Sequence, residues 1–191
     1  MIKYFLGWIL VFETMFLLIP LVTAVIYGEH CFSAILLSMA VCLATGGLLI
    51  WKKPKNTELY SREGFVIVSM SWIVLSLFGC LPFVFSGAIP SFTDALFETV
   101  SGFTTTGASI LAEVEHLPKA MLIWRSFTHW VGGMGVLVFI MAFIPLSGGQ
   151  NIHIMKAESP GPSVSKLVPR VKTTALILYS IYFVLTLIEF V

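Results

Sequence analysis

The run Thr104-Thr105-Thr106-Gly107-Ala108-Ser109 carries the groups best suited to binding a desolvated monovalent cation. Such an ion needs oxygen ligands in place of its water, and consecutive backbone carbonyls supply them without burying a countercharge. Glycine permits the positive-φ conformations that aim successive carbonyls in one direction, and threonine adds a hydroxyl acceptor and a β-branched side chain. The run predicts an ion filter at Thr104, Thr105, Thr106 and Gly107, with a structural turn as the alternative.

The residues before this run predict a short helix that would position it. Ser91 and Asp94 stand in the S-x-x-D order of a helix N-cap, and a mostly apolar stretch of about 13 residues extends to Phe103. Such a helix spans roughly 20 Å, so it reaches the middle of a bilayer without crossing it, and its partially negative C-terminus points toward the ion. A short helix followed by polar chain, between longer apolar runs, indicates a re-entrant segment over 91–109.

The composition is typical of a membrane protein. Of the 191 residues, 58% are hydrophobic and 11% charged, and the mean hydropathy is +0.97, whereas soluble proteins are about 45–50% apolar and about 25% charged. A net charge of +1 leaves no basic surplus for binding nucleic acid. The sequence shows no nucleophile–base pair, metal-ligand spacing or nucleotide-binding motif, so we expect neither an enzyme nor a cofactor.

Apolar runs long enough to cross a bilayer predict an all-α, multi-pass membrane protein. The first run contains Val22-Thr23-Ala24, which resembles the cleavage site of a signal peptide. The run is longer than a signal h-region, however, and it contains Glu13 and Pro20, which favours a membrane span. The last run is still apolar at Val191, so we expect a longer polypeptide interrupted there. The runs are Tyr4–Tyr27, Cys31–Trp51, Phe65–Ser86 and Met121–Pro145, and a fifth begins near Thr173.

Basic residues are concentrated on one side of these runs. Nine of the eleven are Lys3, the group Lys52, Lys53, Lys55 and Arg62, and the group Lys156, Lys166, Arg170 and Lys172. The positive-inside rule then places the N-terminus and both basic loops in the cytoplasm and opens the re-entrant segment to the outside. Carboxylates at that outer mouth would attract cations, although ordinary solvated charge is the alternative. The acidic residues expected there are Glu29, Asp94, Glu98, Glu113 and Glu115.

Small and charged residues of the fourth run predict how it packs. Gly132, Gly133 and Gly135 would allow the pore helix to approach closely, as small residues do between membrane helices. Arg125 is costly against lipid, but it lies near a helix end and Glu98 is a candidate partner.

A few reactive side chains lie within or beside the apolar runs without forming a motif. Glu13 and Glu189 are acids inside runs, and we interpret both as buried hydrogen-bonded or interfacial groups. Cys31, Cys42 and Cys80 are odd in number and lack paired spacing, so they predict small core or lipid-facing side chains.

Three sequence blocks, taken together, resemble the TrkH-like membrane subunits of the Trk/Ktr/HKT superfamily of potassium transporters. The block 97–108, FETVSGFTTTGA, resembles the family's first pore loop, and Trp124-Arg125-Ser126 with 130–135, WVGGMG, resembles the helix that follows. A third block over 157–175, beginning AESPGP, resembles the next cytoplasmic loop. The blocks occur in the family's order across essentially the whole chain; His129, where glutamine is expected, departs from the pattern.

The resemblance implies a subunit of four helix–pore-loop–helix repeats, preceded by an extra helix pair. It would pass K⁺, in some members with or in place of Na⁺, through a filter to which each repeat contributes one glycine; here the ion would lie at Thr105 and Thr106. Residues 1–52 would form the helix pair, 63–146 the first repeat, 147–172 a cytoplasmic loop and 173–191 the start of a second repeat.

The resemblance also implies partners and a location. It predicts the cytoplasmic (inner) membrane, a cytoplasmic nucleotide-binding partner of the TrkA/KtrA type, and a homodimer of the full-length subunit. Two alternatives stay open. Several copies of this chain would assemble one pore, or the chain would be a non-conducting assembly or regulatory membrane protein.

Overall fold

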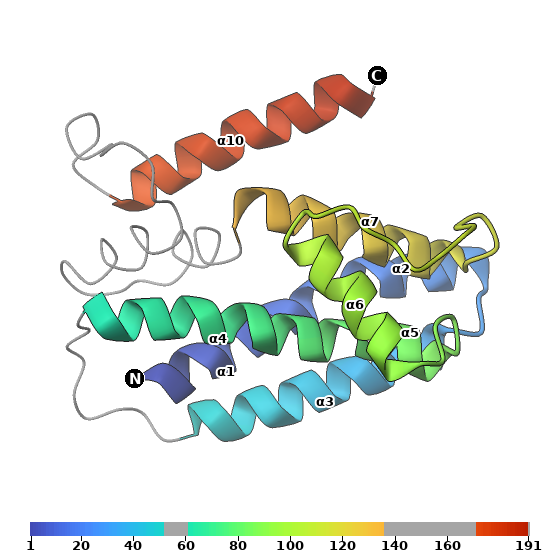
Figure 1. Cartoon of the computed structure of the whole chain (residues 1–191), viewed down its shortest axis with the longest axis horizontal. Helices are drawn as coiled ribbons and strands as arrows, with labels where there is room; N and C mark the ends of the chain where they lie inside the picture. The colour runs from blue at the N-terminus through green and yellow to red at the C-terminus, as the bar shows by residue number, and fades with distance from the viewer. Residues whose placement is uncertain (52–60, 136–170, 191) are drawn as a thin grey trace.

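The computed structural model describes residues 1–51, 61–135 and 171–190 (Figure 1). Every regular element in these ranges is a helix, which confirms the predicted all-α class. The helices are α1 (Ile2–Phe16), α2 (Leu18–Tyr27), α3 (Phe32–Ile50), α4 (Ser61–Gly79), α5 (Leu81–Ser86), α6 (Phe92–Phe103), α7 (Lys119–Met134) and α10 (Val171–Phe190).

Three helical stretches are long and apolar enough to cross a membrane, namely Ile2–Tyr27, Phe32–Ile50 and Glu63–Ser86. They match the first three predicted runs to within a few residues. α7 covers the first part of the fourth run, whose remainder, 136–145, lies outside the described residues. The predicted cytoplasmic loop and the third family block lie outside them as well, up to residue 170, and α10 begins near the predicted start of the fifth run.

Proline interrupts the first and third spans. Pro20 has no N–H to donate, and the first span divides into α1 and α2 at Leu17. Pro82 lies in the first turn of α5, and the third span divides at Cys80. The N–H of Phe83 donates to the carbonyl of Cys80 there. The Gly79 carbonyl instead accepts a hydrogen bond from the Trp124 indole at 2.8 Å, which ties α7 to this break.

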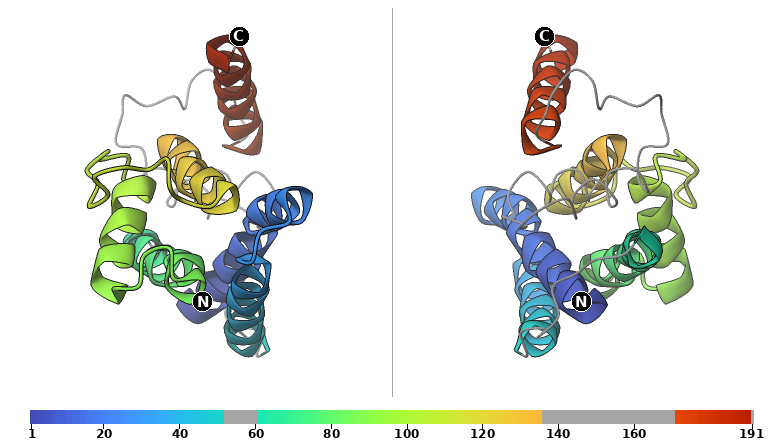
Figure 2. Two further views of the ribbon diagram at one scale, coloured as in Figure 1. Left: turned by 90° about the vertical axis from the view of Figure 1, so that its right-hand side faces the viewer. Right: turned by 90° about the vertical axis from the view of Figure 1, so that its left-hand side faces the viewer.

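The long helices run alongside one another, and α6 lies obliquely across α4 and α7 (Figures 1 and 2). α1 packs against α3 and α4, α2 packs against α7, and α6 packs against both α4 and α7. α6 begins at the end of the bundle where α2 and α5 terminate, on the right in Figure 1, and the chain after α6 returns to that same end. α6 and the chain after it therefore start and finish at the same end of the bundle.

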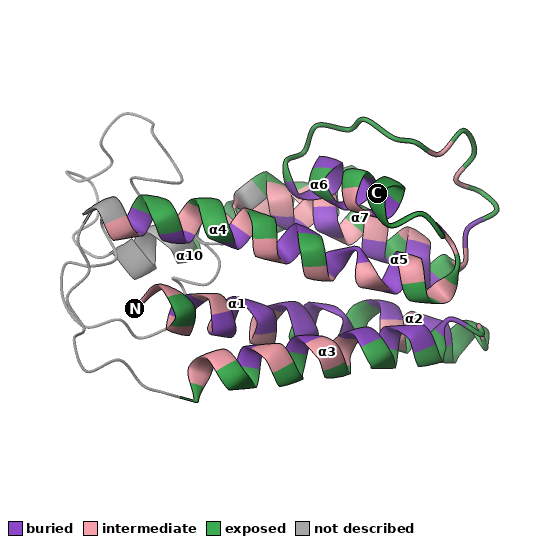
Figure 3. Ribbon diagram, turned by 60° about the horizontal axis from the view of Figure 1, so that its bottom comes forward, coloured by how far each residue is buried: buried purple, intermediate pink, exposed green. Residues whose placement is uncertain are grey.

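The core lies where α1, α4, α6 and α7 meet. Phe103, Met121 and Trp124 are among its fully buried side chains. Large apolar side chains are exposed on the outer surfaces, for example Leu48 at 73% and Ile188 at 67%, and green segments mark such surfaces along α3 and α4 in Figure 3. An apolar exterior over a packed interior fits a lipid environment.

Candidate functional site

α6 is a capped helix of half-membrane length. Its 12 residues give it a length of about 18 Å, too short for a hydrocarbon core of about 30 Å. The hydroxyl of Ser91 accepts a hydrogen bond from the N–H of Asp94 at 3.4 Å, which confirms the predicted N-cap. The Asp94 carboxylate lies in the first turn, where its negative charge interacts favourably with the positive end of the helix dipole. The opposite end of α6 leads directly into the predicted filter.

The backbone dihedral φ of that segment changes sign between neighbouring residues. Thr105 has φ 54° and Gly107 has φ 75°, while Thr104 between α6 and Thr105 has φ −84°. A left-handed conformation is expected for glycine, but it is a marked outlier for a β-branched residue and costs of order 1–3 kcal/mol. Gly107 is the residue that was predicted to permit a positive φ, whereas no signal in the sequence marked Thr105.

Hydrogen bonds to the last turns of α6 hold the segment in this shape. The N–H groups of Thr105 and Thr106 donate to the carbonyls of Gly102 and Ser101, each at 3.0 Å. The Ser101 hydroxyl donates to the carbonyl of Ala108 at 2.5 Å, which ties the far side of the segment back to the helix. Ser101 was absent from the predicted site; a small polar residue one turn before the filter is the only sequence feature that marks it.

The threonine hydroxyls form a local network. Thr104 Oγ1 lies 2.8 Å from Thr106 Oγ1 and donates to the Val100 carbonyl at 2.7 Å. Thr105 Oγ1 donates to the Thr104 carbonyl at 2.7 Å. Residues 104–110 are all exposed in this chain, so the oxygen-rich segment faces away from the packed core.

Glu98 supports the segment from inside the protein and is not part of an outer rim. The residue is only 1% exposed, so the prediction that it belongs to the outer vestibule is wrong. The carboxylate accepts hydrogen bonds from the Ser109 hydroxyl at 3.0 and 3.1 Å and from the Ile110 N–H at 3.1 Å. Arg125 Nε, from α7, donates to Glu98 Oε1 at 2.5 Å, so the structure contains the ion pair for which Glu98 was a candidate. A buried carboxylate is stable there because charge and hydrogen-bonding capacity are both matched.

Three of the other carboxylates predicted at the outer mouth, Asp94, Glu113 and Glu115, are exposed but are not gathered into one cluster, whereas Glu29 is partly buried. Asp94 lies at the start of α6, whereas Glu113 and Glu115 lie in the segment between α6 and α7. Glu113 Oε2 lies 2.9 Å from His116 Nε2. Both side chains of this pair are largely exposed, so solvent screens it strongly.

Gly132 and Gly133 of α7, and Gly135 directly after it, make different contacts. A Cβ at Gly132 would overlap the carbonyl oxygen of Phe103, so this glycine packs against the end of α6, the helix for which the contact was predicted. A Cβ at Gly133 would instead meet the Tyr182 hydroxyl of α10. Gly135 ends α7 with φ 71°, and its carbonyl accepts a hydrogen bond from Tyr179. The prediction of pore-helix packing for Gly133 and Gly135 is therefore corrected: α10 supplies the contacts that the structure gives them.

Glu13 of α1 is buried beside α6. Its side chain is 0% exposed, and neither carboxylate oxygen has a hydrogen-bond partner among the described residues, contrary to our interpretation of a hydrogen-bonded group. An ideal Cβ built on Gly79 would lie 3.0 Å from Glu13 Oε1 and 3.1 Å from both Thr99 and Phe103, so all these groups converge beside α6.

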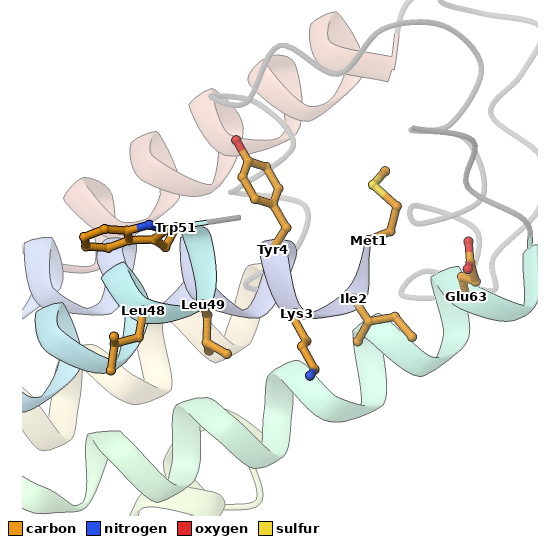
Figure 4. Close-up of a pocket in the computed structure, with 8 residues that line it drawn as sticks. All are labelled: Met1, Ile2, Lys3, Tyr4, Leu48, Leu49, Trp51 and Glu63. Atoms are coloured by element: carbon orange, nitrogen blue, oxygen red, sulfur yellow. The ribbon is translucent and has the colours of Figure 1, made fainter. Parts of the chain in front are cut away.

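A cavity of about 650 Å³ lies apart from these residues, at the end of the bundle that holds the N-terminus (Figure 4). None of its lining residues comes from α6 or the segment after it. In the described ranges no cluster of three His, Cys, Asp or Glu side chains is arranged to hold a metal ion. The lining residues are Met1, Ile2, Lys3, Tyr4, Leu48, Leu49, Trp51 and Glu63.

Comparison with known proteins agrees with this architecture. The model of the TrkH family, described as a cation transport protein, matches residues 32–191. The Trk system potassium uptake protein TrkH of Escherichia coli (strain K12) is 42% identical over 173 residues, which cover 89% of this chain and 36% of that protein. The TrkH protein of Halomonas elongata is 36% identical over 189 residues, which cover 97% of this chain and 39% of that protein.

A solved structure shows the same fold. The crystal structure of the potassium transporter TrkH from Vibrio parahaemolyticus matches with a TM-score of 0.76 and 33% sequence identity, over 97% of this chain and 37% of that one. The chain thus spans little more than a third of the length of these relatives, which are named as potassium uptake proteins or transporters and not as enzymes. From the family match, the identities and the shared fold, the chain belongs to the TrkH family of cation transport proteins.

Proposed function

We propose that this chain contributes one segment of a K⁺-selective filter to a potassium uptake pathway across the cytoplasmic membrane. The observation that carries the proposal is the pair of left-handed residues, Thr105 and Gly107, directly after a half-length helix. Residues of alternating hand turn successive peptide planes the same way, which brings their carbonyls to one side of the chain. Carbonyls so arranged replace the hydration shell of a K⁺ ion, and the C-terminus of α6 adds partial negative charge.

The ion would lie at Thr105 and Thr106, with Thr104 and Gly107 beside it. The exposure of residues 104–110 supports this, because a filter segment must face a lumen shared with other segments. The relatives are more than twice as long as this chain, so we infer that further repeats of the same kind complete the lumen. Residues 63–146 would form the first repeat, and 1–52 the helix pair before it.

The proposed orientation puts the N-terminus and the basic loops in the cytoplasm and α6 at the outer side. The exposed carboxylates Asp94, Glu113 and Glu115 would then raise the cation concentration at the outer mouth. A nucleotide-binding partner of the TrkA/KtrA type would contact the cytoplasmic side, and the full-length subunit would form a homodimer. Transport of K⁺, with or without Na⁺, would follow the membrane potential and the concentration gradient.

The test compares two glycines that have nearly the same positive φ. Gly107 and Gly87 have φ 75° and 72°, and a Cβ at either would meet open space, so serine imposes a similar backbone strain at both. This chain replaces the matching segment of the Escherichia coli relative, and K⁺ and Na⁺ uptake are measured in cells lacking their own K⁺ uptake. We expect Gly107→Ser to lower the K⁺/Na⁺ uptake ratio about tenfold or more, whereas Gly87→Ser leaves the ratio unchanged.

Equal effects of the two substitutions would remove the filter assignment and leave the structural turn. The 191-residue chain expressed alone provides a second arm of the test. Uptake by that chain would show that several copies assemble a pore. An inserted chimera that takes up no K⁺ would favour the non-conducting alternative.

A further inference from the structure

Glu29, in the loop between α2 and α3, caps the N-terminus of α7, which belongs to the proposed first repeat (63–146). Glu29 Oε1 accepts a hydrogen bond from the Lys119 N–H at 2.5 Å, and Oε2 accepts one from the Ala120 N–H at 3.0 Å. These are two of the first N–H groups of α7, which have no partner within the helix. The N-cap position of α7 is Pro118, whose side chain makes no capping hydrogen bond. Glu29 therefore supplies the cap from outside the proposed first repeat, and its negative charge interacts favourably with the positive end of the helix dipole.

The capped helix carries the arginine that supports the filter segment. Arg125 lies six residues after Lys119, about 9 Å along α7. Its Nε donates to the buried Glu98 carboxylate, which also accepts hydrogen bonds from the Ser109 hydroxyl and the Ile110 N–H. Charge-assisted contacts at Lys119–Ala120 and at Arg125, joined by the intervening turns of α7, thus connect Glu29 to the chain that leaves the proposed filter.

α7 is well packed between its cap and Arg125. Ala120, Met121 and Trp124 are each 0% exposed, and the Trp124 indole donates to the Gly79 carbonyl. A segment packed this tightly moves as one body, because the interior has no space for a local bend. A displacement at the first turn of α7 therefore reaches Arg125 and changes how it meets Glu98.

We propose that Glu29 is a positioning residue for the filter, acting from the N-terminal helix pair through α7 and the Arg125–Glu98 pair. The proposal rests on the proposed function of residues 104–107. It assigns to the N-terminal helix pair a part in ion selection, in addition to any part in assembly.

The experiment measures K⁺ uptake kinetics in the chimera described above, after its dependence on Gly107 has been established. Glu29→Gln keeps the size of the side chain but replaces one acceptor oxygen with an amide that opposes an N–H. We expect the KM for K⁺ to rise about two- to tenfold, a change typical of coupling through packed networks, while Vmax per inserted molecule changes little. His30→Gln is the matched control, because it alters the adjacent exposed residue of the same loop.

A double-mutant cycle distinguishes positioning from a loss of folding stability. Ser109→Ala removes a hydroxyl that donates to Glu98, at the far end of the series of contacts. If Glu29 acts through Arg125 and Glu98, the effects of Glu29→Gln and Ser109→Ala on KM are non-additive, whereas independent effects multiply. A cycle without coupling, or a fall in the inserted amount with an unchanged KM, would overturn the proposal. A chimera that takes up no K⁺, or that is indifferent to Gly107→Ser, contradicts the proposed function and this inference together.

Discussion

Gly132 of α7 lies against the carbonyl oxygen of Phe103, the last residue of α6. No side chain fits between them, because a Cβ at position 132 would overlap that oxygen and the carbonyl carbon behind it. The oxygen and the carbon are both backbone atoms of α6. A larger residue at position 132 therefore displaces the end of α6, because no change of side-chain rotamer can make room for it. The position of the proposed filter segment therefore depends on the absence of a side chain at position 132.

Gly132→Ala should consequently disrupt ion selection. We expect the chimera carrying it to insert in the membrane but to lose most of its preference for K⁺ over Na⁺, measured as the ratio of uptake rates. Gly47→Ala in α3 is the control, since a Cβ there meets open space and alanine is favoured over glycine in a helix by about 1 kcal/mol. Normal selectivity in the Gly132→Ala protein would contradict the contact.

The Arg125–Glu98 pair should show the energetics of a buried charge pair. Arg125→Leu leaves a carboxylate with 0% side-chain exposure without its counter-charge, and such losses cost about 3–5 kcal/mol. The double variant Glu98→Gln/Arg125→Leu removes both charges, so we expect it to be more stable than Arg125→Leu alone. The measurement is the thermal midpoint of the detergent-solubilised chain. A double variant less stable than the single one would argue against a charge-based role for Glu98.

Cys31, directly before the first residue of α3, should react slowly with thiol reagents. Burial, with an added contribution from the nearby Glu29 carboxylate, raises the pKa of the Cys31 thiol from 9.0 to about 11. Because only the thiolate reacts, the rate of maleimide labelling should climb about tenfold per pH unit from neutral pH and level off only near the raised pKa.

Glu29→Gln should lower the pKa of Cys31 and shift this labelling curve to lower pH, because the Sγ of Cys31 donates to Glu29 Oε2 at 3.4 Å. The assay uses a chain in which Cys42 and Cys80 are replaced by alanine, with the denatured chain as the reference. An unshifted curve would show that Glu29 and Cys31 are not in contact in the membrane.

Glu13 should tolerate loss of its charge. Burying a polar group without hydrogen bonds is unfavourable, and neither oxygen of Glu13 has a partner among the described residues. We therefore expect Glu13→Leu, which has a similar volume, to raise the thermal midpoint of the chain, and Glu13→Gln to leave it nearly unchanged. A large fall in the midpoint of either variant would reveal a bound water or ion that Glu13 holds behind α6.

Local features were predictable from the sequence because they depend on neighbouring residues. Apolar runs of membrane length predicted the three spans, and the Ser91–Asp94 spacing predicted the start of α6. The threonine–glycine run after α6 predicted the filter segment that we propose, since only a few residue types combine backbone freedom with oxygen ligands.

The tertiary structure alone decided how side chains from distant elements are used. Glu98 and Asp94 lie in the same short helix, yet Glu98 is buried against Arg125 and Ser109 while Asp94 is exposed. Hydrogen bonds to the end of α6 accompany the left-handed conformation of Thr105, and packing brought Glu29 to the first turn of α7. Composition and spacing offered Glu98 only as a candidate partner for Arg125 and did not indicate the other contacts, because each depends on which helix faces meet in three dimensions and on which polar groups are left there to be paired.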